Sequence, residues 1–213
     1  PDGYWPAVAE VLKRHNILLI ADEVICGFGR TGRMFGCETY GFQPDIASFA
    51  KGITSGYIPL GGVAVSDEIF EVLSAPDRMF MHGFTYSGHP VACAVALRNL
   101  QIIEEEQLPD NAREAGSYLL SELSELLDRP YVGNVRGKGL MLLVELVADK
   151  ATKAKFEPSF QLASKLEQAT RKRGLIVRCT PEGIVMAPPL TITREECDFL
   201  LEAVAGALED VLG

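Results

Sequence analysis

The chain has 213 residues, which is enough for one large domain or two modest ones. Its formal net charge is −9, and an acidic balance of this kind disfavours binding to a nucleic-acid backbone. No apolar run approaches the roughly 20 residues that a membrane-spanning helix needs. The sequence therefore predicts neither a nucleic-acid partner nor a membrane partner.

The first half of the chain alternates helical and strand-like segments. An amphipathic stretch over 4–16 predicts a helix. Residues 17–24, "ILLIADEV", form an apolar run that ends in two acids, which is typical of a strand covered on both faces in a parallel sheet. The pattern continues with strands expected at 45–50 and 61–66 and helices expected at 67–75 and 90–106. This alternation predicts an α/β domain.

The character of the chain changes around 104–111, "EEEQLPDN", and we place a domain boundary near residue 107. Gly174 is expected to end a helix from about 160, and Thr193 with Glu196 forms the capping box of a last helix. Strand pieces are expected at 132–147, 175–179 and 183–189. Residues 107–213 are therefore predicted to form a smaller α+β domain.

Five cysteines are present, and none forms a C-x-x-C pair: Cys26, Cys37, Cys93, Cys179 and Cys197. An odd number of unpaired cysteines indicates reduced thiols rather than a disulfide framework. Free cysteine packs as a small hydrophobic residue, so structural roles are expected. This pattern favours a cytoplasmic protein.

A glycine-rich stretch follows the first predicted strand. Residues 27–32, "GFGRTG", fit the pattern G-x-G-x-x-G, which binds a dinucleotide when a helix opens at the glycines. The residues that follow, "RMFGCETYGFQPD", are broken by glycine and proline and show no helical stripe. Acids also precede the glycines, and they would repel a pyrophosphate. The sequence favours a tightly folded loop over a nicotinamide cofactor site.

Asp22 and Glu23 end the first predicted strand, where open α/β sheets bind ligands. Adjacent strand residues point to opposite faces, so the two carboxylates cannot form one acid pair. One of them is expected to face a cleft. The alternative is a structural acid that caps a neighbouring helix or pairs with Arg30 or Arg33, and this stretch alone does not choose between them.

Lys51 follows the second predicted strand, in "DIASFAKGITSGYIPLGG", and precedes Gly52. The simplest alternative is a loop lysine without a chemical role. A lysine amine held in a cleft can instead attack a carbonyl. An acid at one strand end and a lysine at another are the minimal protein parts for pyridoxal 5′-phosphate (PLP), in which the lysine forms a Schiff base and the carboxylate keeps the pyridine nitrogen protonated.

A third segment, 82–90, "HGFTYSGHP", carries small hydroxyl groups and two histidines. Zinc is disfavoured because no third ligand lies at a suitable spacing. Hydroxyl and backbone N–H groups suit a phosphate better. The alternative is a polar loop in which Ser87 or Gly88 starts the next helix.

In order and spacing, these segments resemble the class III (fold type I) PLP-dependent aminotransferases, and most closely their ω-amino acid:pyruvate or amine:pyruvate branch. The motifs are "IADEVICGFGRTG", "PDIASFAKGITSGYIPLGG" and "HGFTYSGHPVACAVAL", with "VRGKGLMLLVEL" and "GLIVRCTPEGIVMAPPLTIT" nearer the C-terminus. The resemblance covers nearly the whole chain. It implies that 1–106 are the C-terminal part of the PLP-binding large domain, with a mostly parallel sheet and helices, and that 107–213 are the C-terminal small domain.

The resemblance also implies site roles. Lys51 is the Schiff-base lysine and the proton carrier, Asp22 holds the pyridinium nitrogen, and Val24 packs under the cofactor ring. Thr85 reaches the phosphate of the cofactor bound by the partner subunit, so the active sites of a homodimer are shared. Arg178 in "LIVRC" is a mobile arginine that pairs with a substrate carboxylate and swings out for an amine that lacks one.

The implied reaction is ping-pong transfer of an amino group from an amine or ω-amino acid to a keto acid such as pyruvate. Ile25, where the broader class often has glutamine, fits this branch, and Glu23 is expected to be structural. The family's N-terminal half, with its phosphate loop and aromatic lid, is not recognised here, so the sequence is expected to be a C-terminal half.

Three alternatives stay open from the sequence. One is another PLP reaction on the same scaffold, such as racemisation, decarboxylation or an aminomutase reaction. The second is a catalytically incomplete fragment that folds or dimerises without binding the cofactor. The third is a nicotinamide-dependent dehydrogenase, which rests only on the glycine pattern.

Overall fold

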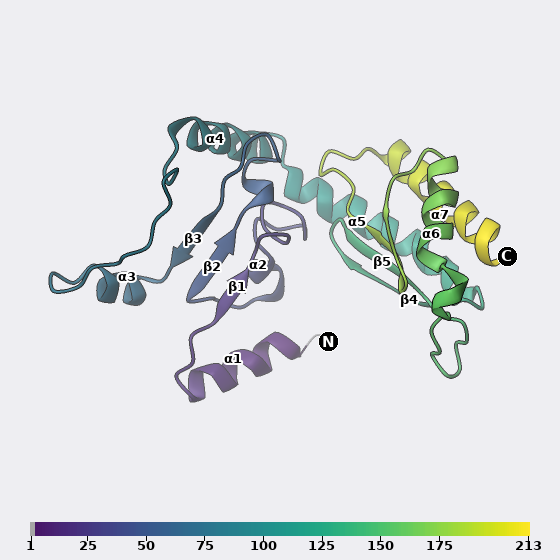
Figure 1. Ribbon diagram of the computed structural model, residues 1–213, viewed down its shortest axis with the longest axis horizontal. Helices are drawn as coiled ribbons and strands as arrows, with labels where there is room; N and C mark the ends of the chain where they lie inside the picture. The colour runs from purple at the N-terminus through teal and green to yellow at the C-terminus, as the bar shows by residue number, and fades with distance from the viewer. Residues whose placement is uncertain (1–2) are drawn as a thin grey trace. The chain divides into compact units, whose positions relative to one another are not determined.

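The structure is a computed structural model that describes residues 3–213. The chain forms two compact units, Pro1–Pro109 and Asp110–Gly213 (Figure 1). Each unit combines helices with a sheet of its own, as the α/β prediction requires. None of the helices in the described part of the chain is both long and apolar enough to cross a bilayer.

The N-terminal unit contains a three-stranded sheet in the order β1-β2-β3. β1 (Ile20–Asp22) pairs in parallel with β2 (Ile46–Phe49), and β3 (Gly62–Val65) pairs antiparallel with β2. The helical segments of this unit are α1 (Tyr4–Arg14), α2 (Gly36–Tyr40), the 3₁₀ turn η1 (Lys51–Ile53), α3 (Asp67–Leu73) and α4 (Pro90–Glu105).

The first strand differs from its prediction. The apolar run 17–24 was expected to be one strand covered on both faces, but β1 spans only three residues. The side chains of Ile17, Leu18 and Ile20 are 53%, 56% and 64% exposed. The reason is that β1 is an edge strand that pairs only with β2, and nothing in residues 3–213 covers these side chains.

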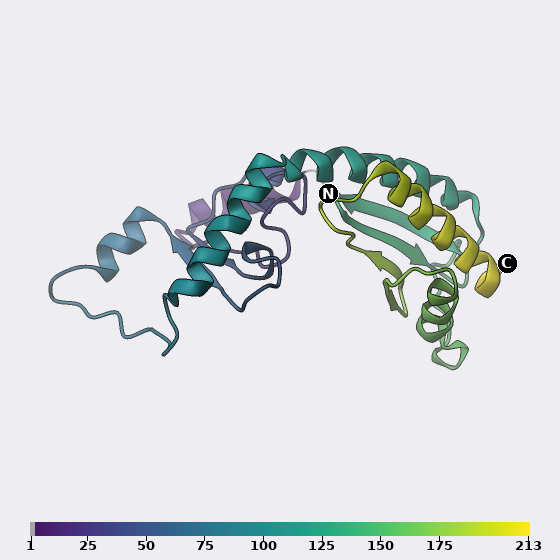
Figure 2. The same cartoon turned by 90° about the horizontal axis from the view of Figure 1, so that it is seen from above.

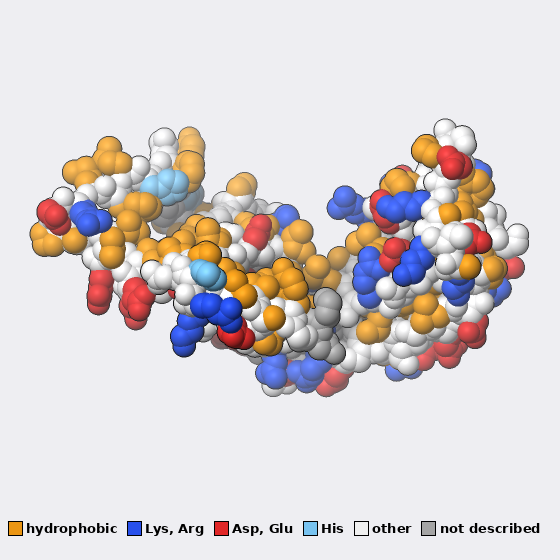
Figure 3. Space-filling model, turned by 90° about the horizontal axis from the view of Figure 1, so that it is seen from below, with side chains coloured by type: hydrophobic (Ala, Val, Ile, Leu, Met, Phe, Trp, Pro, Cys, Tyr) orange, Lys and Arg blue, Asp and Glu red, His pale blue; other side chains and the backbone are white. Residues whose placement is uncertain are grey.

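An exposed apolar segment joins α3 to α4 and stands away from the three strands in both ribbon views (Figures 1 and 2). Its exposed large side chains are Met79, Phe80, Met81, Phe84 and Tyr86. A groove of about 1040 Å³ lies against this segment, lined in part by Phe49, Val63, Val65, Phe70, Phe80 and Phe84. Hydrophobic side chains gather over the N-terminal unit in Figure 3. Apolar surface of this extent marks an interaction surface.

The C-terminal unit contains a four-stranded antiparallel sheet in the order β4-β5-β7-β6. The strands are β4 (Val132–Lys138), β5 (Met141–Leu146), β6 (Arg178–Thr180) and β7 (Gly183–Met186). The helices are α5 (Leu108–Ser124), α6 (Leu162–Lys172) and α7 (Arg194–Leu212), with short 3₁₀ turns η2 (Glu125–Asp128) and η3 (Pro158–Phe160).

The helix ends of this unit confirm the predicted capping. Thr193 Oγ1 accepts from the Glu196 N–H at 3.2 Å, and Glu196 Oε2 accepts from the Thr193 N–H at 2.8 Å. Gly174 adopts φ 77° just past α6, where a left-handed glycine ends a helix. α5 and α7 lie side by side in Figures 1 and 2, joined by a 2.5 Å bond from Tyr118 Oη to Asp198 Oδ1.

The hydrophobic core is concentrated in the C-terminal unit. All but one of the largest fully buried side chains belong to it, and the exception is Thr54. α5, α6 and α7 bury one face each against the sheet, through residues such as Leu119, Leu166 and Leu208. This unit therefore closes a core of its own, whereas the N-terminal unit leaves apolar side chains exposed on its strands.

Candidate active site

An acid and an amine lie at or just after the carboxyl ends of two neighbouring parallel strands of the N-terminal sheet. Asp22 is the last residue of β1, and Lys51 follows β2 by two residues. β1 and β2 are parallel, with Asp22 opposite Ser48, so both carboxyl ends lie at the same edge. This is the position at which open α/β sheets bind ligands.

The Asp22 carboxylate is exposed and only partly used by the protein. Its Oδ1 accepts a bond of 3.1 Å from the Val24 N–H and a longer one of 3.4 Å from Ser48 Oγ. No ion pair to Asp22 occurs within residues 3–213. The second carboxylate oxygen is thus left for a ligand donor.

Glu23 faces the opposite way and is 2% exposed. Its Oε2 accepts from the Gly36 N–H at 2.8 Å and its Oε1 from the Cys37 N–H at 2.7 Å. These are free N–H groups of the first turn of α2, where a carboxylate is stabilising. The expectation that the adjacent acids face apart and that Glu23 is structural is confirmed.

The charge and burial of Glu23 also act on two neighbouring thiols. Burial raises the pKa of Cys26, and the negative charges of Glu23 and Asp22 raise it further. Burial, followed by the Glu23 charge, raises the pKa of Cys37 as well. Both thiols therefore stay protonated at neutral pH, in keeping with structural roles.

The glycine-rich stretch forms a tight loop, as predicted. The Gly27 N–H donates to the Glu23 carbonyl at 2.8 Å, and Gly29 and Gly32 adopt φ of 98° and 90°. No helix is predicted after this loop, but the five-residue α2 forms because the Glu23 carboxylate accepts two of its first N–H groups. α2 begins four residues beyond Gly32, so no helix opens at the glycines and the dinucleotide alternative loses its structural basis.

Phe28 of this loop packs beneath the turn that carries Lys51. It is 4% exposed and makes edge-to-face contacts with Phe35 and Phe49, with ring centroids 5.5 and 5.9 Å away. A Cβ on Gly52 would lie 3.1 Å from the Phe28 Cβ. The close contact explains why glycine follows Lys51.

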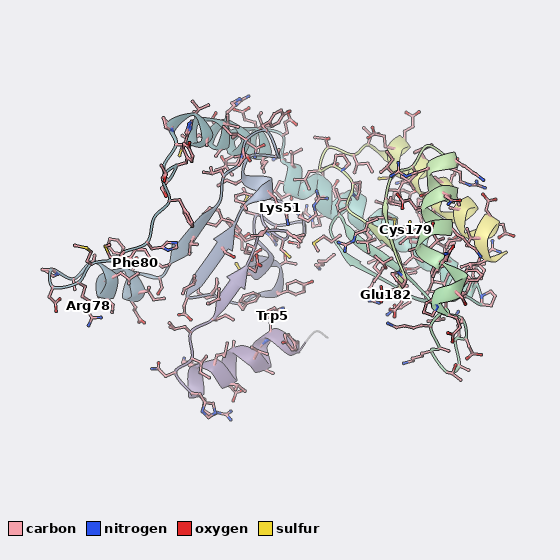
Figure 4. The ribbon with its side chains drawn as sticks, in the orientation of Figure 1. Trp5, Lys51, Arg78, Phe80, Cys179 and Glu182 are labelled. Carbon is pink, nitrogen blue, oxygen red and sulfur yellow. The ribbon has the colours of Figure 1, made fainter. Side chains whose placement is uncertain are left out.

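Lys51 opens η1 with a left-handed φ of 45°, and its side chain is exposed (Figure 4). For a residue other than glycine this conformation costs of order 1–3 kcal/mol and persists only where the surroundings enforce it. Asn99 of α4 bonds to the carbonyls of Gly52 and Ile53 at 2.8 and 3.0 Å. Sequence reasoning missed Asn99, although a polar residue in the helical register of Ala92 and Ala96 was a usable signal.

The remaining two residues that the resemblance places at the cofactor lie in irregular segments. Val24 lies in the turn after β1 and is half-buried. Thr85 is exposed in the segment between α3 and α4. The helix that follows starts differently from the alternative drawn for Ser87 or Gly88: His89 is the N-cap, and its Nδ1 accepts from the Ala92 N–H at 3.4 Å. Pro90 sets this boundary because proline suits the first helical position.

Arg178 is the first residue of β6, in the C-terminal unit, and its side chain is exposed. It is registered opposite Val185 of β7. No salt bridge to Arg178 occurs among the residues that the structure describes. Its guanidinium is therefore available to an anionic ligand.

Burial raises the pKa of the adjacent thiol, Cys179, which is labelled in Figure 4.

Comparison with known proteins gives a consistent set of relatives. The profile of the family described as "Aminotransferase class-III" matches residues 1–208. A putrescine–pyruvate aminotransferase of Pseudomonas aeruginosa is 46% identical over 210 residues, which is 98% of this chain and 46% of that protein. A diaminobutyrate–2-oxoglutarate transaminase of Halomonas elongata is 45% identical over 217 residues, covering 99% of this chain and 46% of that one.

Solved structures agree. A thermostable (S)-enantioselective ω-transaminase from Thermomicrobium roseum superposes with a TM-score of 0.97 at 71% identity, over 100% of this chain and 48% of that chain. An amine transaminase from an uncultivated Pseudomonas species, in a PLP-bound form, gives a TM-score of 0.93 at 46% identity, over 99% of this chain and 48% of that chain. The chain thus spans about half the length of the relatives that it matches.

Proposed function

Because this chain belongs to the class III aminotransferases, we propose that the protein containing it moves an amino group from an amine or ω-amino acid to a keto acid such as pyruvate, by a ping-pong mechanism. One observation carries the proposal. Asp22 and Lys51 lie at the carboxyl ends of adjacent parallel strands, with an exposed carboxylate and an exposed amine.

The family and the PLP-bound neighbour indicate pyridoxal phosphate as the cofactor. When bound, it supplies an electron sink for the electrons left on the substrate carbon. The residues present fit it. Asp22 keeps a carboxylate oxygen for the ring N–H, since the bonds within the protein use only Oδ1. Lys51 offers a primary amine on a fixed turn, and it would hold the cofactor's aldehyde carbon.

The chain's own residues would then act as follows. Lys51 Nζ would take the proton from the substrate carbon that bears the amine, as a general base, and would return it to the carbon on the other side of the amine nitrogen, as a general acid. Asp22 keeps the ring nitrogen protonated through both steps. Val24, two residues further along in the turn after β1, would pack against the face of the ring.

Arg178 would bind the carboxylate of an ω-amino acid or keto acid through both guanidinium nitrogens. Its exposed position, free of any salt bridge in the described residues, supports this role. A side chain that is not tied down is able to swing aside when the substrate is a plain amine.

We further propose a cytoplasmic homodimer in which Thr85 bonds to the cofactor phosphate of the partner subunit. The exposed apolar side chains on both sides of Thr85, Phe84 and Tyr86, support an interface at this segment. The free cysteines support a reducing compartment. In this assignment residues 1–106 belong to the PLP-binding large domain and 107–213 form the small domain.

The test uses the full natural protein, incubated with pyridoxal phosphate, reduced with borohydride and mapped by mass spectrometry. We expect the label on Lys51 and loss of amino transfer in Lys51→Ala, with Lys165→Ala, an exposed lysine of α6, as the matched control. Dependence on a stoichiometric keto acid separates transamination from racemisation, decarboxylation and aminomutase chemistry. Label scattered over surface lysines, or full turnover by Lys51→Ala, would contradict the proposal.

A further inference from the structure

Asn99 is the one polar residue in the buried stripe of α4. The other buried side chains of that helix are Ala92, Ala96 and Ile103, and together the four follow the helical repeat. Asn99 is 9% exposed. A buried amide at such a position is costly unless each of its polar groups finds a partner.

The Asn99 amide is fully engaged, and all its partners lie in the turn that begins with Lys51. Its Nδ2 donates to the Gly52 carbonyl at 2.8 Å and to the Ile53 carbonyl at 3.0 Å. Its Oδ1 accepts from Ser55 Oγ at 2.7 Å. Two donors and an acceptor on one planar group thus hold Gly52, Ile53 and Ser55, three of the four residues that follow Lys51.

These bonds act on the backbone where its conformation is least favourable. Lys51 and Ser55 adopt φ of 45° and 49°, both in the left-handed region. Asn99 supplies a partner for the Ile53 carbonyl at the end of the turn and a second one for the Gly52 carbonyl, which also accepts from the Ser55 N–H at 3.3 Å. Phe28 contacts Gly52, so the turn is also supported by packing. The backbone that carries Lys51 is therefore held by a residue that is distant in the sequence. The bond from Asn99 to the Gly52 carbonyl spans 47 positions.

We infer that Asn99 is the positioning residue of Lys51: it fixes the turn so that the amine is presented to the cofactor. The inference rests on the proposed function of Lys51. No side chain of similar shape replaces the amide. Aspartate would set an oxygen against two carbonyl oxygens, and leucine would remove all three side-chain bonds. Only an amide provides the two donors and the acceptor.

The chain offers a matched control in Asn111 of the C-terminal unit. Its Nδ2 also donates to two carbonyls, those of Leu190 and Ile192, at 2.7 and 3.1 Å. Asn111→Asp therefore removes two N–H···O=C bonds of the same kind as those that Asn99→Asp removes. All the partners of Asn111 lie within residues 110–213, so its loss affects stability without touching the Lys51 turn.

The experiment follows the rate at which Lys51 is labelled in the cofactor-free full natural protein, with pyridoxal phosphate as the probe and borohydride as the trap. Mass spectrometry gives the Lys51 rate relative to that of Lys165, and thermal unfolding is measured in parallel. We expect Asn99→Asp to slow Lys51 labelling at least about tenfold, because misplacement by an ångström carries costs of this size. Asn111→Asp is expected to lose a similar amount of thermal stability with the relative rate unchanged.

A second variant covers the case in which Asn99→Asp does not fold. Ser55→Ala removes only the bond to Asn99 Oδ1 at an exposed position, and it is expected to slow Lys51 labelling about two- to fivefold. An unchanged relative rate of Lys51 labelling in Asn99→Asp overturns the inference about Asn99 but leaves the proposed function intact. If Asn99→Asp is unfolded, an unchanged relative rate in Ser55→Ala has the same meaning. Absence of Lys51 labelling in the wild-type protein overturns the proposed function and the inference with it.

Discussion

Asp22 and Glu23 are adjacent acids whose replacement by the matching amides should have opposite effects. Glu23 is buried, and each of its carboxylate oxygens accepts one backbone N–H of α2. Asp22 is exposed, and its shorter bond is the 3.1 Å contact from the Val24 N–H. The pair therefore separates a residue that stabilises the fold from one that we propose acts on the cofactor.

The magnitudes follow from these contacts. A hydrogen bond to a charged group contributes about 1.5–3 kcal/mol, and an unsatisfied buried donor costs about 1–3 kcal/mol. Glu23→Gln keeps one acceptor but turns an NH₂ group toward the second N–H, so about 2–3 kcal/mol of unfolding free energy should be lost. Asp22→Asn keeps Oδ1 as an acceptor at an exposed site, so its stability should change by no more than about 0.5 kcal/mol.

The assay compares unfolding in urea with turnover per folded protein, in the full natural protein. Glu23→Gln is expected to unfold at lower urea concentration and to keep turnover within about tenfold of the wild type. Asp22→Asn is expected to unfold as the wild type does and to lose turnover by about a hundredfold or more, as when a positioned electrostatic group is removed. The reasoning is refuted if Asp22→Asn is the less stable of the two, or if Glu23→Gln unfolds like the wild type.

Three further predictions concern other parts of the chain. Arg178→Ala should reduce kcat/KM for carboxylated substrates at least about tenfold more than for plain amines, and equal losses in steady-state assays would show that it binds no carboxylate. Gly116→Ala should lower the unfolding free energy by about 1–3 kcal/mol, because the new Cβ would clash with the Gly139 carbonyl oxygen; an unchanged thermal melt would contradict this contact. Burial first, and then the Glu23 charge, raises the pKa of Cys26 above the ordinary 9.0. The folded state therefore favours the protonated thiol, and this contribution to the free energy of unfolding is fully present below pH 9. It is lost as the pH rises through the pKa of Cys26 in the folded state. Cys26→Ala should flatten the fall of urea stability above pH 9, and an identical fall in the variant would count against the linkage.

Local signals in the sequence predicted the elements of the C-terminal unit well. The capping box at Thr193 and the glycine after α6 are formed within a few residues, so the sequence alone contains the interaction. The strand pairs around 139–140 and 181–182 are hairpins, whose register depends on short turns. Such elements need little information from the rest of the chain.

The N-terminal unit was harder to predict because its strands depend on neighbours that are distant in the sequence. The run 17–24 has the composition of a strand covered on both faces, yet β1 pairs with one strand and keeps Ile17, Leu18 and Ile20 exposed. The short α2 was missed for a related reason: its cap is the side chain of Glu23, 13 and 14 residues before the N–H groups that it accepts. Helical periodicity contains no sign of such a cap.

The same distinction applies to the candidate site. The two residues proposed to bind the cofactor, Asp22 and Lys51, were recognisable because strand ends and glycines mark them in the sequence. The residue that holds the Lys51 backbone was not, because Asn99 reaches the Gly52 carbonyl across 47 positions of the chain. Reactive groups need a particular chemistry, which sequence motifs reveal, but their positioning needs only a well-placed hydrogen-bonding group. The control of Lys51 is therefore expected to depend as much on α4 as on the motif that contains the lysine.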